Sequence, residues 1–109
     1  MKSYRKPTIQ EIYILELLIK KGSLNFSHSW KKDLLVYPMD DGEMGSLYLY
    51  PLGKEKSDAS SSEFVSDYQF KDKDGVDVIA SLYLDSEGDL FELDIWKTDF
   101  SKVIEIPNF

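Results

Sequence analysis

The sequence predicts an α+β domain in which an N-terminal helix packs on an antiparallel meander sheet of about five strands. Three observations predict this fold. A capped, apolar-rich segment comes first, five later runs alternate apolar and polar residues, and acidic turns with glycine separate several of those runs. The chain has 109 residues, 42% of them hydrophobic, which is enough for one core. We therefore expect a single domain over residues 1–109.

The helix is predicted to begin after Thr8 and to end at Gly22. Thr8 and Glu11 have the spacing of a capping box, and Gly22 suits a left-handed residue at the helix end. Apolar side chains surround most of the helix axis, which is more than one core contact needs. Either Phe26, Trp30 and residues 104–109 cover the second apolar side, or another chain does. We favour cover from within the chain.

The five alternating runs have the period of two that half-buried strands show. The links 71–75 and 85–89 place glycine near their ends, which favours hairpins with a left-handed glycine. Residues 103–106 are a candidate for a further short edge strand. The predicted strands are residues 34–37, 46–50, 64–70, 76–84 and 90–97.

Two segments are predicted to connect these elements. Residues 23–33 are expected to reach the core through Leu24, Phe26 and Trp30, with a short helical turn around Trp30. Residues 53–63 are polar and rich in serine, which is typical of a loop between strands.

Charge is distributed unevenly along the chain. Residues 1–36 carry seven basic and three acidic side chains, whereas residues 37–109 carry six basic and seventeen acidic ones. Such a surface repels nucleic acid and attracts basic proteins. The chain has no cysteine and no apolar stretch long enough to cross a bilayer, so we expect a soluble, cytoplasmic protein without a membrane partner.

No motif predicts an enzyme, a metal site or a cofactor. His28 is the only histidine and lies in a polar segment, where we expect an incidental surface residue. Glu92 and Asp94 share a strand face, yet their alternation with apolar residues is typical of a solvated sheet face. The acidic segment 72–77 faintly resembles a calcium loop but lacks the length and the last glutamate of an EF-hand, so we expect a hairpin turn.

A protein-binding surface remains the best candidate site. Acids in turns are expected to be exposed, and tyrosine or tryptophan beside them provides contact area at low entropic cost. The predicted contact residues are Asp40, Asp41, Glu43, Asp72, Asp74, Asp77, Tyr48, Tyr50 and Trp96.

Several stretches also resemble a known family. They are residues 5–8 with 11–12, 38–42 with 44–47, 68–70 with 74–76, 78–82, and the run Leu-Phe-Glu-Leu-Asp-Ile-Trp-Lys at 90–97 with 99–100. With these residues the chain resembles a small bacterial family of unknown function whose members are associated with immunity genes of contact-dependent growth inhibition and related toxin systems. The resemblance covers nearly the whole chain except the serine-rich loop.

The resemblance implies an immunity protein, and the charge agrees with it. Many toxins of these systems are nucleases with basic clefts, which an acidic protein occludes without chemistry of its own. We therefore expect a monomer that binds and neutralises a basic toxin, with a nuclease domain as the candidate. The alternative is a non-catalytic binding or regulatory module, or a homodimer, with an unknown partner.

Overall fold

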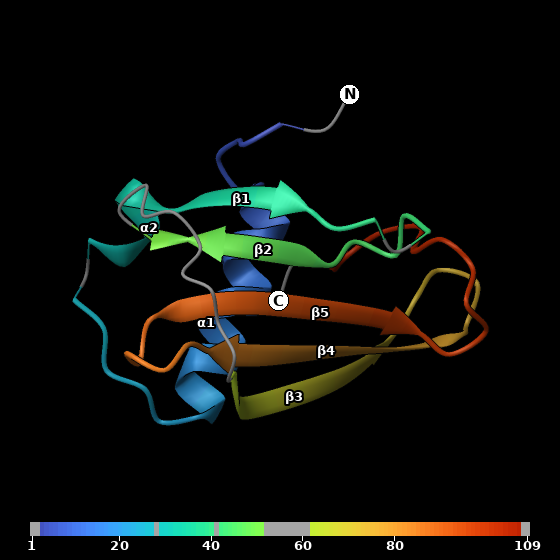
Figure 1. Ribbon diagram of the computed structural model, residues 1–109. Helices are drawn as coiled ribbons and strands as arrows, with labels where there is room; N and C mark the ends of the chain where they lie inside the picture. The colour runs from blue at the N-terminus through green and yellow to red at the C-terminus, as the bar shows by residue number, and fades with distance from the viewer. Residues whose placement is uncertain (1–2, 28, 41, 52–61, 108–109) are drawn as a thin grey trace.

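The computed structural model describes residues 3–27, 29–40, 42–51 and 62–107. Helix α1 packs on one face of an antiparallel sheet whose strand order is β1-β2-β5-β4-β3 (Figure 1). The predicted α+β class is therefore confirmed. The elements are α1 Ile9–Lys21, α2 Trp30–Asp33, β1 Leu35–Pro38, β2 Leu47–Tyr50, β3 Glu63–Lys71, β4 Asp77–Leu84 and β5 Leu90–Lys97.

The start of α1 follows the capping box that the sequence predicts. The Thr8 hydroxyl accepts a hydrogen bond from the Glu11 amide at 3.2 Å, and the Glu11 carboxylate accepts one from the Thr8 amide at 2.8 Å. The same carboxylate receives two bonds from the Arg5 guanidinium, at 2.8 and 3.0 Å. Arg5 also pairs through its backbone with Val36 of β1, so Arg5 links the start of α1 to the sheet.

The predicted role of Gly22 at the helix end is wrong. Gly22 caps α1 with φ −83°, and the left-handed residue is Ser23, with φ 56°. A Cβ atom on Gly22 would instead overlap the Val65 side chain of β3. Because Gly22 has no side chain, the end of α1 can approach the edge strand β3 closely.

The last strand occupies the centre of the sheet. β1 pairs with β2, and β3, β4 and β5 follow one another as hairpins, while β5 joins the two groups by pairing with β2. The chain therefore passes from β2 to the far edge at β3 through residues 52–61, which lie outside the described residues and contain most of the predicted serine-rich loop.

The core lies between α1 and the sheet. Ile14, Leu15 and Leu18 of the helix are fully buried against the apolar residues of the strands. Phe26, Trp30, Val103 and Ile106 pack against this core, whereas Tyr13 and Leu17 on another side of α1 are half-buried. Residues 103–106 form no strand and the Ile104 side chain is exposed, so the C-terminal contribution comes from its neighbours.

The face of the sheet opposite α1 is called the open face below. It consists of the strand residues whose side chains point away from α1. No described helix or strand covers it (Figure 1), and the Tyr4 ring lies against two of its residues, Tyr37 and Tyr50. Strand alternation places one set of side chains in the core and the other on this face. The described residues therefore form two layers, α1 and the sheet, with one sheet face that no described helix covers.

Candidate functional site

A row of aromatic residues crosses the open face from edge to edge. Neighbouring strands pair in register Tyr37 with Tyr48, Tyr48 with Glu92, Glu92 with Tyr83 and Tyr83 with Phe64. Residues paired in this way point to the same side of a sheet. One residue from each strand therefore contributes to a line in which four aromatic rings flank a central carboxylate.

A second, acidic row lies beside the aromatic one. Asp94 pairs with Ser81, and Ser81 pairs with Asp67. Burial raises the pKa of Tyr83, and so do the charges of Asp94, Glu92 and Asp67. The centre of the open face is therefore negatively charged as well as aromatic.

Trp96 begins the third row, beside Ile79 and Gln69. Its side chain is 43% exposed, and its ring centroid lies 6.0 Å from that of Phe100, which is 71% exposed. Two large, adjoining and exposed aromatic side chains are unusual on a protein that has no partner, and such pairs mark binding surfaces.

The N-terminal segment adds a third aromatic group at the β1 edge. The Tyr4 ring makes edge contacts with Tyr37 and Tyr50, at centroid distances of 5.0 and 4.9 Å. Burial and then a hydrogen bond with Tyr4 raise the pKa of Tyr50 to about 12, so its hydroxyl stays protonated. The Tyr50 side chain is itself buried and packs against the Tyr4 ring.

The end of the sheet next to Lys97 is built around a buried charge cluster. The Lys97 side chain is 1% exposed, and its Nζ atom donates to Asp72 Oδ2 at 2.9 Å and to Asp74 Oδ2 at 2.6 Å. A third bond, 3.2 Å long, goes to the carbonyl of Lys102. Burial lowers the pKa of Lys97, but the bonds to Asp74 and Asp72 outweigh it, so the pKa is raised and the amine is charged.

Asp72 connects this cluster to the C-terminal segment. Its carboxylate accepts backbone hydrogen bonds from Ile104 at 2.6 Å, Lys73 at 2.8 Å and Glu105 at 3.1 Å. Burial alone would raise the pKa of Asp72, but these bonds and the one from Lys97 lower it to about 2. The Lys97 ammonium occupies the position between the carboxylates that a cation would take, so this turn is not a calcium loop.

Three other acids near this end also have lysine partners. Lys71 pairs with Asp77 at 2.9 Å and Lys73 with Glu105 at 2.8 Å, and Lys102 pairs with Glu43 of the β1–β2 loop. The term acidic end is used below for this loop, the β3–β4 turn, Lys97 and residues 101–105, which share one end of the sheet (Figure 1).

The structure divides the predicted contact residues between these two regions. Tyr48, Tyr50 and Trp96 belong to the open face, and Asp77 lies where that face meets the acidic end. Asp40, Glu43 and Asp74 are exposed acids of the end, and Asp41 lies outside the described residues, as does His28. The expectation that Asp72 is exposed is wrong: it is 4% exposed and holds Lys97.

Several residues of both regions were not predicted. Strand alternation places Lys97 on the same side as Leu93 and Ile95, and this parity is the signal that could have identified it as buried. Tyr4, Tyr37 and Phe64 could be assigned to the open face only from the strand register, which the sequence does not provide. Phe100 lies beyond the last strand and carried no signal.

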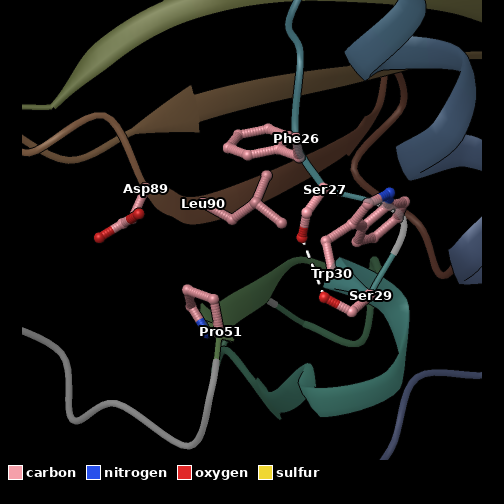
Figure 2. Close-up of a pocket in the computed structure, with 7 residues that line it drawn as sticks. All are labelled: Phe26, Ser27, Ser29, Trp30, Pro51, Asp89 and Leu90. Atoms are coloured by element: carbon pink, nitrogen blue, oxygen red, sulfur yellow. Dashed lines mark hydrogen bonds between the residues drawn. The ribbon is translucent and has the colours of Figure 1, made fainter.

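A small hollow at the opposite end of the sheet does not offer a chemical site. It holds about 170 Å³ between Phe26, Trp30, Pro51 and Leu90 (Figure 2). The polar groups at its wall are the Ser27 and Ser29 hydroxyls, bonded to each other at 2.9 Å, and Asp89, whose carboxylate points away from Trp30 (Figure 2). The lining is therefore mainly apolar.

The β4–β5 turn gathers three carboxylates. Asp85, Glu87 and Asp89 each place one oxygen within 4.8 Å of the others. Asp85 Oδ1 accepts the Glu87 amide at 2.8 Å and the Asp89 amide at 3.0 Å, so this acid shapes its own turn.

The fold and surface define a class: a small α+β domain with one helix-covered and one open sheet face. Within that class, the chain belongs to the family described as Domain of unknown function (DUF6984), whose model matches residues 4–107. No curated protein and no solved structure matches the chain. None of the helices that the structure describes is long and apolar enough to cross a membrane.

Proposed function

We propose that this protein binds a basic protein through the open face of its sheet, without catalysing a reaction. The observation that carries the proposal is the row of four aromatic residues with Glu92 at its centre, beside the acidic row. Aromatic side chains provide the contact area of protein interfaces, and the carboxylates select partners that bring arginine or lysine.

The size of the open face suits such an interface. Three strands of eight or nine residues and two of four, about 4.8 Å apart and rising about 3.3 Å per residue, present a flat area of roughly 500 Å², to which protruding side chains add. A standard interface takes about 800 Å² of accessible surface from each partner. The face therefore provides area of the order that a specific complex needs.

Charge favours a basic partner over a second copy of this chain. Two copies joined by a twofold axis through the open face would bring Glu92, Asp94 and Asp67 against the same acids of the other copy. Within the strands, the basic residue on this face is Lys71, which already pairs with Asp77. A basic partner provides the missing complement, and we propose that the free protein is a monomer.

An immunity function is the specific form of this proposal. The resemblance noted from the sequence implies a toxin partner, and a basic nuclease domain has the charge that the open face would attract. The protein would then act in the cytoplasm, where a chain without cysteine needs no oxidising environment. Occlusion of the toxin's active site requires binding alone.

Site-specific photo-cross-linking in the native cells tests the proposal. A benzoylphenylalanine residue replaces Gln69, which is exposed on the open face, and in a matched control it replaces Ile9, which is exposed on α1. We expect a cross-link from position 69, and not from position 9, to a protein with an excess of lysine and arginine. A neutral or acidic partner, a cross-link to this same chain, or cross-links from position 9 alone would contradict the proposal.

The immunity form has its own test. The partner identified by cross-linking is purified on its own, and its nuclease activity is measured with and without added purified protein. Inhibition at equimolar concentration is expected. A partner that is no nuclease, or one whose activity persists in the complex, would exclude the immunity form but leave the binding proposal intact.

A further inference from the structure

Phe100 combines two costly features in one residue. It is more exposed than any other large apolar side chain of the described residues, and its backbone has φ 64°. The left-handed region is unfavourable for a bulky side chain, and glycine or asparagine is the usual occupant. Strained residues that persist in a fold are concentrated at functional sites.

The turn around Phe100 is fixed by hydrogen bonds on both sides. The Phe100 amide donates to the Lys97 carbonyl at 2.8 Å, and the Thr98 amide donates to the Asp77 carbonyl at 2.9 Å. Asp99 Oδ1 accepts the Ser101 amide at 3.0 Å and the Ser101 hydroxyl at 2.6 Å. The backbone that carries the exposed ring is thus held in place before any partner arrives, which lowers the entropic cost of binding.

The surroundings of the ring fit one kind of ligand group. The Trp96 and Phe100 rings lie at 54° to each other, and Trp96 belongs to the open face. Asp94 precedes Trp96 by two residues on the same strand face, and Asp99 is the exposed neighbour of Phe100. Its bonds with Ser101 lower the pKa of Asp99, so this carboxylate is charged at neutral pH.

A guanidinium group suits both the aromatic pair and the two neighbouring carboxylates. It stacks on aromatic faces and donates hydrogen bonds in its plane to carboxylates, whereas a lysine ammonium is a compact, strongly hydrated charge. We infer that the Trp96–Phe100 pair, flanked by Asp94 and Asp99, is the arginine-binding anchor of the open face. This inference rests on the proposed function and specifies the partner's contact group as an exposed arginine.

The test uses short peptides as probes and the full chain as the receptor. The tripeptides Arg-Gly-Arg and Lys-Gly-Lys are titrated against the protein, and NMR signals of Trp96, Phe100 and Tyr83 are followed. We expect the arginine peptide to shift the Trp96 indole and Phe100 signals and to bind at least about threefold more tightly than the lysine peptide.

Three variants separate a binding role from a structural one. Phe100→Gly is expected to weaken arginine-peptide binding about threefold or more, while the melting temperature stays the same or rises by a few degrees because glycine removes the backbone strain. Phe100→Tyr, which keeps the ring, retains the affinity. Ile9→Ala, on the opposite side of the molecule, leaves the affinity within about twofold of wild type.

Each other outcome has a defined meaning. Unchanged binding by Phe100→Gly, or a clear fall in its melting temperature, would overturn the inference and make Phe100 a structural residue. Shifts near Tyr83 without shifts at Trp96 would overturn it as well, but would leave the proposed function standing. Shifts confined to α1 or the acidic end would contradict both.

Discussion

The acidic end and the open face are both rich in acids, but they use them differently. At the end, Asp72 and Asp74 surround the buried Lys97, and Glu43 pairs with Lys102. On the open face, Glu92 stands between the half-buried Tyr48 and Tyr83, and Asp94 lies two residues before the exposed Trp96. Acids at the end hold the chain together, whereas those on the face adjoin surface that a partner can reach. Net charge alone does not distinguish these two uses.

The contrast is sharpest at two consecutive residues. Trp96 points outward and is exposed, while Lys97 points inward and is buried. A lysine is rarely buried unless it is paired, and the pairing with Asp72 and Asp74 explains why the polar residue lies inside. The Lys97 carbonyl accepts the Phe100 amide, and the Lys97 Nζ atom donates to the Lys102 carbonyl. Lys97 therefore also holds the turn that carries Phe100.

Removing Asp72 is expected to have the largest effect on stability. Asp72→Ala leaves the Lys97 charge without its buried carboxylate partner and releases the amides of Ile104 and Glu105. Breaking a buried pair in this way costs about 3–5 kcal/mol of unfolding free energy. Urea denaturation measures it. Asp85→Ala, which removes the matching acid of the β4–β5 turn, is the control and should cost only about 1 kcal/mol.

A loss below about 1 kcal/mol for Asp72→Ala would contradict the structural role of the acidic end. The acids there would then be as available to a partner as those of the open face.

Acid should weaken the acidic end, because Asp72 stabilises the fold only while its carboxylate is charged. The pKa of Asp72 lies at about 2 in the folded protein, below its ordinary value of 3.8, so its contribution is present above about pH 4 and is lost as pH falls towards 2. The difference corresponds to about 2 kcal/mol. Unfolding free energies of the wild type and Asp72→Asn, measured between pH 7 and pH 2, are expected to converge as pH falls. Parallel curves would show that Asp72 does not titrate as described.

The exposed ion pairs of the acidic end should contribute least. Lys73 and Glu105 meet at 2.8 Å, but both side chains are more than half exposed, so solvent screens their attraction. Lys73→Ala is expected to leave the melting temperature unchanged within about 2 °C. A drop comparable to that of Asp72→Ala would mean that the whole lysine-paired surface, and not its buried centre, holds the C-terminal segment.

Local signals predicted much of the fold. The capping box at Thr8 and Glu11 defined the helix start, and alternation located β3, β4 and β5 within one residue at each end. Strand order was beyond reach, because the pairing of β2 with β5 depends on contacts more than forty residues apart in sequence. The aromatic row depends on that order. Of the aromatic residues on the open face, only Tyr48, Tyr50 and Trp96 were therefore predicted as contact residues.

The acidic end was misjudged for a related reason. In sequence, Asp72 looks like any turn acid, and Lys97 lies twenty-five residues away. Their pairing requires β4 and β5 to bring the two residues together below the surface. Gly22 was misjudged similarly, since the strand that approaches it is distant in sequence.

Affinity for the partner cross-linked through position 69 tests the central claim most directly. The dissociation constant of the complex with this partner is measured by calorimetry at low salt for the wild type and two double variants. The open-face variant combines Glu92→Gln with Asp94→Asn, and the acidic-end variant combines Asp40→Asn with Glu43→Gln. We predict at least about tenfold weaker binding for the open-face variant and a change within about twofold for the acidic-end variant. The reverse pattern, with both variants folded, would show that the acidic end and not the open face binds the partner.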